Sequence, residues 1–352
     1  MIKVLGLALY GPLAASTRYR LGQYVPGLAK YGIDLEIRHL LGDVYLKRTF
    51  GGRSKPWVAM VQAGWQRLND LRAQGAYDAM MLHCELFPLM PAWVEGSLLR
   101  QPYAYDFDDA FYLKYRSGRL GTLERFLGGK FDSVTQGAKS ITAGNQVLKR
   151  YAANLNPDTT LLPTVVDTTR YLPDPRPRGR ELVIGWIGSP STAPYLGELI
   201  APLSALGKEG PVRLVVIGGP APIVPGVAVE ELPWSEATEV GLINGFDIGV
   251  MPLPNDAWAR GKCAFKLIQY MACGIPVIAS PVGANVDVVG KDCGLLPATE
   301  AEWLEAFRQL RDEPRLAAEM GYAGRERVEQ HYSLLRNLPV LAEVLVATAG
   351  RG

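Results

Sequence analysis

The segment from residue 261 to residue 285 constrains the fold of this chain more than any other. Its order of residue types predicts a loop, a helix, a sharp stop and then a buried strand. Gly274 stands where a helix ends in a left-handed residue, and Pro276 prevents the helix from continuing. The apolar run from Pro276 to Ser280 is typical of a strand that is buried on both faces. The segment therefore predicts a helix–strand unit of a parallel α/β sheet.

Two lysines precede the apolar part of this predicted helix. Lys262, Lys266 and Gln269 are spaced four and three residues apart, which predicts one shared helix face. Ammonium groups at a helix N-terminus meet partial positive charge and free N–H donors. The arrangement therefore favours a bound anion, since helix N-termini bind phosphate and lysines strengthen that binding. The alternative is a surface helix with two solvated lysines, which is where most lysines lie.

The complete segment resembles the donor-site motif of the retaining glycosyltransferases of family 4, which have the GT-B fold. The run from Gln269 to Val277 matches the second half of that motif. The family has glutamates at two positions, which are Gly261 and Gln269 here. In the family the second glutamate holds the nucleotide ribose, and the amide of Gln269 is able to replace it because it both donates and accepts. One subgroup carries Gly-Lys-x-x-x-Lys in this place, and the chain resembles that subgroup.

This resemblance implies an α/β fold of two Rossmann-like domains facing a cleft, with the last helix crossing back to the first domain. The length agrees, because 352 residues exceed what one core usually supports. Strands and helices alternate in both halves, which by itself predicts parallel sheets covered on both faces. The predicted parts are an acceptor-side domain over 1–172 with a C-terminal helix over 333–352, a Pro-rich linker over 173–179 and a donor-binding domain over 180–332.

A second loop, after the first predicted strand of the C-terminal half, offers backbone and hydroxyl donors to a diphosphate. It is similar to the family loop that approaches the donor diphosphate, and a simple Gly-Ser turn is the alternative. Phe265 and Trp234 are also assigned to the donor site, although Trp234 either stacks on a base or simply packs. The predicted diphosphate loop comprises Gly188, Ser189, Ser191 and Thr192.

The N-terminal half supplies the predicted catalytic partners and acceptor-binding groups. Alternation along the string around Tyr105 puts Asp106 and Asp108 on one face of a strand and Asp109 just past its end. Asp108 and Asp109 are predicted to bind acceptor hydroxyls or assist catalysis, and capping of the next helix is the alternative. A DxD string is also the metal site of the GT-A fold, but that fold lacks the second-domain motif seen here. The acceptor-binding candidates are Arg18, Arg20, His83 and Asn145.

The remaining composition limits cofactors and compartment. None of the four cysteines has CxxC spacing and the three histidines are scattered, so free thiols in a reducing cytoplasm and no protein-bound metal are predicted. No other cofactor is expected besides the donor substrate. There is no apolar run of 18 residues, which argues against a transmembrane helix. The apolar N-terminus is interpreted as a first β-strand rather than a signal peptide.

Formal charge is uneven along the chain. Residues 1–171 carry 21 Lys and Arg against 14 Asp and Glu, or +7, whereas the remainder carries 16 against 21, or −5. A basic first half favours an anionic partner, such as a phosphate-bearing lipid acceptor or the inner face of the plasma membrane, with random drift as the alternative. Nucleic acid is not favoured, because no run combines dense Arg and Lys with stacking aromatics.

These features together predict a nucleotide-sugar-dependent, retaining glycosyltransferase of cell-envelope polysaccharide or glycoconjugate synthesis. The family implies that a phosphate oxygen of the donor accepts the acceptor proton. Lys262 and Lys266 would then act by neutralising the diphosphate as the glycosidic bond breaks. Two alternatives stay open. A nucleotide-sugar 2-epimerase shares the architecture but needs carboxylate and histidine acid–base groups. A catalytically silent nucleotide-sugar-binding scaffold would explain the loss of both family glutamates.

Overall fold

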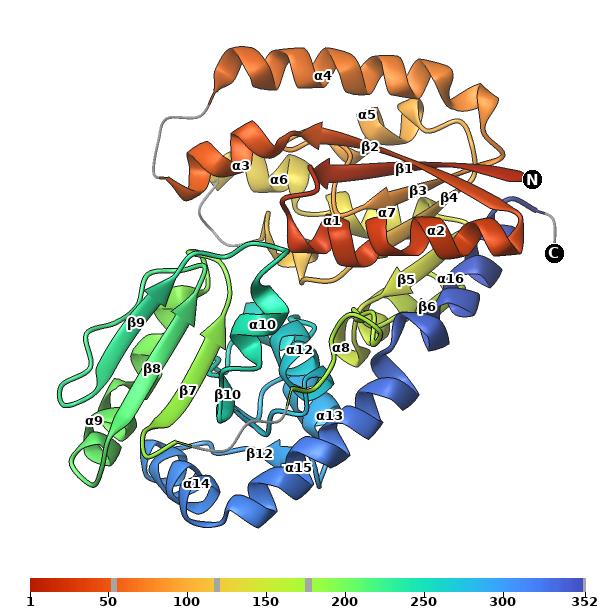
Figure 1. The fold of residues 1–352 in the computed structure, drawn as a ribbon. Helices are drawn as coiled ribbons and strands as arrows, with labels where there is room; N and C mark the ends of the chain where they lie inside the picture. The colour runs from red at the N-terminus through yellow and green to blue at the C-terminus, as the bar shows by residue number, and fades with distance from the viewer. Residues whose placement is uncertain (52–55, 117–120, 175–178, 351–352) are drawn as a thin grey trace. The chain divides into compact units, whose positions relative to one another are not determined.

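Two compact α/β units make up the chain in the computed structural model (Figure 1). The structure describes residues 1–51, 56–116, 121–174 and 179–350. The first unit comprises residues 1–165, 261–263 and 334–352, and the second comprises residues 166–260 and 264–333. Each unit contains one six-stranded parallel sheet, so the predicted two-domain α/β fold is confirmed. Among the described residues, no helix combines the length and apolar character needed to cross a membrane.

The sheet of the first unit has the strand order β2-β1-β3-β4-β5-β6, with every neighbouring pair parallel. Its strands are β1 (Ile2–Tyr10), β2 (Ile33–Leu41), β3 (Ala79–His83), β4 (Tyr103–Phe107), β5 (Ser140–Ala143) and β6 (Thr159–Leu161). Every residue of β3, β4 and β5 is buried, because helices cover both faces of a parallel sheet. The polar residues His83, Asp106 and Thr142 are among them, and they require partners inside the core.

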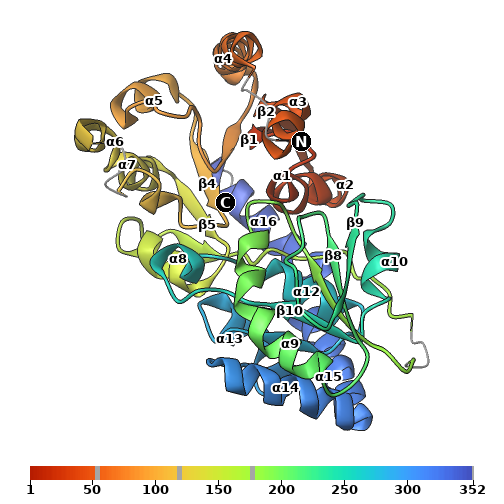
Figure 2. The same cartoon turned by 90° about the vertical axis from the view of Figure 1, so that its left-hand side faces the viewer.

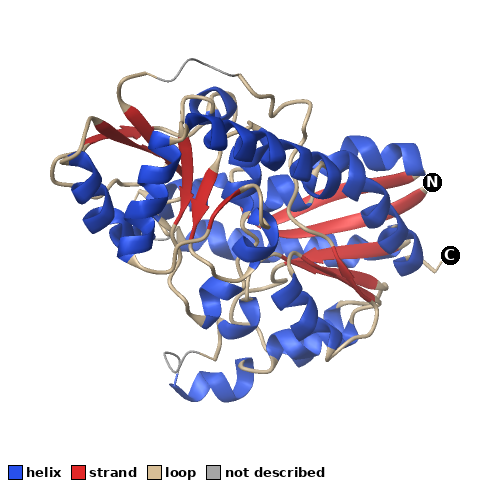
Figure 3. Ribbon diagram, turned by 90° about the horizontal axis from the view of Figure 1, so that it is seen from below, coloured by secondary structure: helices blue, strands red, loops and turns tan. Residues whose placement is uncertain are grey.

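Helices surround this sheet, as Figure 3 shows for the strands of both units. They are α1 (Ala15–Arg20), α2 (Val25–Leu28), α3 (Asp43–Phe50), α4 (Trp57–Arg72), α5 (Ala92–Leu98), α6 (Glu124–Leu127), α7 (Lys130–Gly137), α8 (Gln146–Ala153) and α16 (Leu334–Thr348). Leu338, Leu341 and Leu345 of α16 pack in a buried cluster with Val4 and Leu28. The C-terminal helix therefore belongs to the first unit, as predicted.

The sheet of the second unit has the order β12-β11-β10-β7-β8-β9, again with parallel neighbours. Its strands are β7 (Leu182–Ile187), β8 (Val212–Ile217), β9 (Ala228–Leu232), β10 (Ile248–Met251), β11 (Val277–Ala279) and β12 (Gly294–Leu295). Its helices are α9 (Ile200–Gly207), α10 (Glu239–Ile243), α11 (Ala257–Arg260), α12 (Phe265–Ala272), α13 (Ala284–Val289), α14 (Glu300–Asp312) and α15 (Pro314–Arg327). Local capping supports them; for example, Thr299 and Glu302 form a reciprocal capping box at α14.

The predicted helix–stop–strand unit is present, with one correction. Gly274 has φ +72° and β11 follows it, as expected. However, α12 begins at Phe265 because Ala264 is left-handed, with φ +54°, and a helix does not continue through that conformation. Lys262 therefore precedes the helix and belongs to the first unit, whereas Lys266 lies on α12. The prediction that Lys262, Lys266 and Gln269 share one helix face is wrong.

The division between the units differs from the boundary that the sequence predicted. It falls between Val165 and Val166 rather than after residue 172. Tyr171 is completely buried in an apolar cluster of the second unit, and Val166 bridges to Ser333. Pro-rich composition does not report which core the preceding residues join. Residues 175–178 of the predicted linker lie outside the described residues.

Close backbone contact between α15 and the end of α12 yields a stability prediction. A Cβ atom on Gly321 would lie 2.1 Å from the carbonyl oxygen of Gly274. Gly321→Ala should therefore force the helix away and lower the free energy of unfolding by about 1–3 kcal/mol, measured by urea denaturation. Gly241→Ala on α10 is the control, because its Cβ would have open space. Equal stabilities of the two variants would contradict this packing.

Candidate functional site

Lys266 lies against the loop that follows β7. A Cβ atom on Gly188 would meet Lys266 Cε at 2.8 Å and the Trp186 ring at 2.4 Å. Glycine at this position thus lets the lysine pass close to the loop backbone. The Lys266 ammonium lies 5.2 Å from the centre of the buried Trp186 ring, within the range of a cation–π contact. Two predicted donor-site residues, Gly188 and Lys266, are therefore neighbours in the second unit.

The hydroxyl groups of this loop bond within the loop itself. Ser189 Oγ and Ser191 Oγ lie 2.8 Å apart, and Thr192 Oγ1 donates to the Ser189 carbonyl at 3.2 Å. The backbone N–H of Thr192 donates to the same carbonyl. The loop is thus a closed turn, as in the Gly-Ser alternative. Ser191 is exposed and both other hydroxyl residues are half-buried, so the turn also presents polar groups at the carboxyl end of β7.

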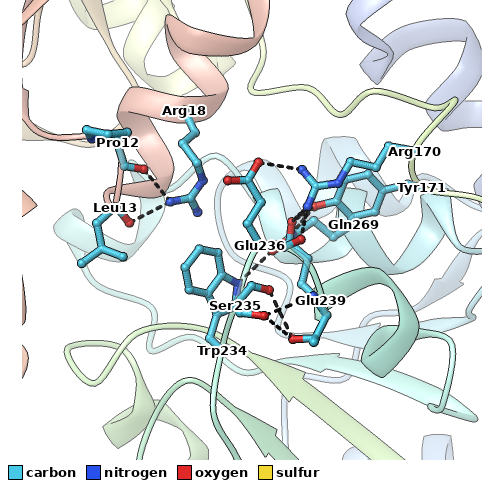
Figure 4. A network of polar contacts seen from close by, with 11 residues as sticks. Pro12, Leu13, Arg18, Arg170, Tyr171, Trp234, Ser235, Glu236, Glu239 and Gln269 are labelled. Atoms are coloured by element: carbon cyan, nitrogen blue, oxygen red, sulfur yellow. Dashed lines mark hydrogen bonds and ion pairs between the residues drawn. The ribbon is translucent and has the colours of Figure 1, made fainter.

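A buried glutamate that the sequence did not indicate organises the polar side chains near α12. Glu239 on α10 is 1% exposed and accepts hydrogen bonds from Trp234 Nε1 at 2.8 Å and Tyr171 OH at 2.7 Å (Figure 4). Arg170 adds an ion pair at 3.0 Å. Gln269 Nε2 in turn donates to Tyr171 OH at 2.9 Å. The Glu239 carboxylate is therefore connected through the Tyr171 hydroxyl to Gln269, the position at which the family has its second glutamate.

This network constrains two predicted donor-site residues. The Gln269 side chain is 4% exposed and its amide nitrogen is already engaged. Trp234 is half-buried against the apolar cluster of the second unit, and its indole N–H is fixed by Glu239. Phe265, the first residue of α12, also packs at the margin of that cluster. Gln269, Trp234 and Phe265 therefore all have contacts within the second unit. Their contact with a nucleotide stays a prediction.

In the first unit, residues 261–263 are held by the loops that follow β4 and β5. Asn145 Nδ2 donates to the carbonyls of Gly261 at 2.7 Å and Lys262 at 3.0 Å. Lys262 Nζ forms an ion pair with Asp109 Oδ1 at 3.4 Å, and Cys263 Sγ donates to the Asp108 carbonyl at 3.0 Å. The predicted catalytic residues Lys262, Asp108 and Asp109 are therefore brought together in one unit.

The amide nitrogen and oxygen of Asn145 both bond within the first unit, which leaves little of the side chain for an acceptor. Its side-chain oxygen accepts the Leu148 N–H and caps α8, while its nitrogen holds residues 261–263. It is 5% exposed. The short helix after Asp109, Phe111–Leu113, has no side-chain cap, so the alternative that Asp108 or Asp109 caps it is not observed.

Arg20 was predicted to bind an acceptor phosphate, and the structure corrects this. Its guanidinium is completely buried and pairs with both carboxylate oxygens of Asp106 while donating to the Leu162 carbonyl. Asp106 also accepts from Thr142 Oγ1 at 2.5 Å and contacts His83 Nδ1 at 2.7 Å. Burial alone would raise the pKa of Asp106, but Arg20 and His83 outweigh it and hold the pKa below its usual value. No surface of Arg20 remains for a ligand.

The other two acceptor candidates are placed differently. Arg18 Nη1 donates to the carbonyls of Pro12 and Leu13, each at 2.8 Å, and so supports the loop after β1 (Figure 4). His83 is 1% exposed, with Nδ1 against Asp106 and Nε2 3.0 Å from Cys84 Sγ. Burial and the nearby carboxylates raise the pKa of the Cys84 thiol well above its usual value.

Comparison with known proteins finds one family model that matches part of the chain and several structures with the same fold. Residues 181–313 match the family model of the glycosyl transferases group 1. Sucrose-phosphate synthase from Thermosynechococcus elongatus has a similar structure, with TM-score 0.69, 15% identity, and coverage of 97% of this chain and 98% of that one. HepE of Anabaena, solved with UDP and glucose, gives 0.68 and 14%, with 98% and 99% covered. A glycosyltransferase from Rickettsia africae gives 0.68 and 14%, with 100% and 99% covered.

No curated protein matches the sequence of this chain. The structural matches show that the chain has the GT-B fold, and residues 181–313 carry a glycosyl transferases group 1 domain. The predicted resemblance to these glycosyltransferases is thus confirmed for the fold and for residues 181–313.

The buried Arg20–Asp106 pair yields a second stability prediction. Arg20→Leu leaves a buried carboxylate without its cation and should cost about 3–5 kcal/mol at neutral pH, measured by urea denaturation. In the native protein the lowered pKa of Asp106 stabilises the fold above its unfolded-state pKa. In the variant, burial raises that pKa instead, so the penalty should shrink as the pH falls and the carboxyl is protonated. Arg100→Leu, at an exposed position, is the control. A deficit that does not change with pH would contradict this assignment.

Proposed function

We propose that this chain transfers a sugar from a nucleotide-diphosphate sugar to a glycan or lipid-linked acceptor with retention of configuration. Cell-envelope polysaccharide or glycoconjugate synthesis is the proposed setting. The observation that carries the proposal is the contact of Lys266 with the Gly188 loop inside the group 1 domain. Both lie past the carboxyl end of β7, where α/β sheets bind their ligands. The HepE structure contains UDP and glucose, which makes UDP-sugars the first donors to test.

The proposed chemistry uses charge and position. Lys266, in the first turn of α12, would neutralise the diphosphate as the bond to the sugar breaks. Lys262 is proposed as a second cation, and its partner Asp109, with Asp108, as the group that meets the acceptor. A phosphate oxygen of the donor would accept the acceptor proton. This step requires no protein-bound metal and no cofactor.

The Glu239 network is proposed to support the nucleoside end of the donor. Gln269 occupies the position of the family's ribose-binding glutamate, and Tyr171 links it to a buried carboxylate. The relay polarises the Tyr171 hydroxyl and fixes the Gln269 amide, so that the Gln269 carbonyl oxygen stays oriented. Trp234 donates its indole N–H to the same carboxylate, and its ring is proposed to stack on the base.

The donor site is tested with Lys266→Ala. Loss of the ammonium should reduce turnover by roughly a hundredfold or more, on the scale of other groups that stabilise transition-state charge. Release of UDP from UDP-sugars is measured, together with thermal shifts by UDP, GDP, dTDP, CMP and ADP. One nucleotide should stabilise the native protein, less so the variant. Lys208→Ala removes an exposed lysine of the same unit and is the control.

The outcomes separate the alternatives. Activity of Lys266→Ala within a few fold of native would remove its proposed role. Nucleotide binding without transfer or slow donor hydrolysis would favour a silent scaffold. Interconversion of the sugar without an acceptor would favour an epimerase.

We also propose peripheral contact of the first unit with an anionic membrane on its cytoplasmic side. Helix α4 lies along the outer side of this unit, next to β2 (Figures 1 and 2). It exposes Trp57, Val61 and Trp65, spaced four residues apart on one face and 69%, 61% and 60% exposed. On α3, Lys47 is exposed on the same helix face as the exposed Val44. Tryptophan favours the lipid–water interface and lysine favours anionic lipids.

A vesicle experiment tests this contact. The native protein should sediment with vesicles that contain phosphatidylglycerol and less with pure phosphatidylcholine, because charge and apolar area act together. Trp57→Ser with Trp65→Ser should weaken binding several-fold. Trp93→Ser, which changes a 77% exposed residue on α5, is the matched control. Absence of vesicle binding, or a dimer that the double variant abolishes, would overturn the proposal.

A further inference from the structure

Three potential metal ligands from the ends of two neighbouring strands meet in the first unit. His83 ends β3, Cys84 follows it, and Asp108 lies just past the end of β4. One ligand atom from each residue lies within 4.8 Å of the other two. Strands β3 and β4 are parallel neighbours, so the residues after them come together at the same sheet edge. All three residues belong to the first unit, whereas the donor loop and Lys266 belong to the second.

The backbone at Cys84 is shaped so that two consecutive side chains face one another. Consecutive residues of an extended strand point to opposite faces. Cys84 instead has φ +66°, in the left-handed region that residues with a Cβ rarely adopt. This conformation places Cys84 Sγ 3.0 Å from His83 Nε2. The Cys84 N–H donates to the Asp106 carbonyl and Tyr105 OH donates to the Cys84 carbonyl, so the turn is held on both sides.

Asp106 orients the imidazole as the outer carboxylate of a metal site would. His83 Nδ1 lies 2.7 Å from Asp106 Oδ2, and the carboxylate is fixed in turn by Arg20 and Thr142. With the proton on Nδ1, Nε2 keeps a lone pair, and Nε2 is the ring nitrogen next to Cys84 Sγ. Histidines that bind metals almost always donate their other ring N–H to such a partner.

Asp108 is held in place through its backbone. The backbone carbonyl of Asp108 accepts from Cys263 Sγ at 3.0 Å and fixes the residue. Within residues 1–51, 56–116, 121–174 and 179–350, no hydrogen bond or ion pair to the Asp108 carboxylate itself is found. Asp108 is half-buried, whereas His83 and Cys84 are buried. The carboxylate therefore forms the side of the group that is open to an incoming ion.

We propose that His83 Nε2, Cys84 Sγ and the Asp108 carboxylate bind one divalent zinc-like metal ion. One nitrogen, one sulfur and one oxygen ligand suit Zn²⁺ better than Mg²⁺ or Ca²⁺, which prefer oxygen alone. A thiolate and a carboxylate balance the two positive charges of the ion in a buried place. Three protein ligands leave a fourth position for water or another oxygen ligand. This site goes beyond the proposed sugar transfer, whose diphosphate step does not use it.

Cobalt titration of the complete, chelator-treated chain tests the proposal. Native protein should bind about one Co²⁺ per chain and gain the near-ultraviolet absorption of a thiolate–cobalt bond, and Zn²⁺ should displace the cobalt. Cys84→Ser should abolish that absorption. Asp108→Asn should weaken binding at least tenfold, a loss comparable to the effect of losing an outer carboxylate. Cys293→Ser, which changes a buried cysteine of the second unit, should bind as the native protein does.

The opposite results would overturn the site. Native protein that binds neither Co²⁺ nor Zn²⁺ at micromolar concentration would show that the group is a thiol–imidazole contact alone. Binding that persists unchanged in Asp108→Asn and Cys84→Ser would place the metal elsewhere. If Cys84→Ser does not fold, the half-buried Asp108→Asn decides. Nucleotide-induced thermal shifts of the same chelated protein separate this result from any failure of the donor site.

Discussion

The buried carboxylate of Asp106 joins several elements of the first unit. Asp106 sits in the middle of a six-stranded sheet, where an uncompensated charge would be strongly destabilising. It is compensated from three other elements, by Arg20 of α1, His83 of β3 and Thr142 of β5. The same interaction therefore fixes the helix after β1, the ends of two neighbouring strands and the ring of the histidine. The loops that carry Cys84, Asp108 and Asn145 follow β3, β4 and β5 in turn.

The second unit achieves the same positioning with glycine and a buried glutamate. Gly188 lets the Lys266 side chain pass against the loop after β7, and the Trp186 ring makes a cation–π contact with the Lys266 ammonium. Glu239 links α10, Tyr171 and Trp234 and reaches Gln269 through Tyr171. Both units thus place polar groups at the carboxyl ends of parallel strands. His83, Gln269 and Lys266 contact the buried residues Asp106, Tyr171 and Trp186, and these contacts limit their movement.

Sequence reasoning succeeded where the signal was local. The helix stop at Gly274 and the buried strand after it follow from φ preferences and apolar runs, and both were found. Predictions from the sequence were wrong or missing where no local pattern existed, or where a neighbouring residue changed the backbone conformation. Helical spacing suggested one face for Lys262 and Lys266, but left-handed Ala264 separates them. Glu239 has the surroundings of an ordinary helix start in the sequence, and its burial follows from partners far along the chain.

By itself, the sequence determined the fold class, the two-domain organisation and the resemblance of residues 181–313 to the glycosyl transferases group 1, because periodicity, helix stops and the donor motif are local patterns. Tertiary structure alone decided which polar residues are buried in the core and hydrogen-bonded there. Arg20 and Asn145 resemble surface residues in the sequence, yet both are buried and engaged. Their fate depends on residues far away along the chain, such as Asp106 for Arg20 and Gly261 for Asn145. Partners at such separations are set by how the sheet assembles, which no local pattern records.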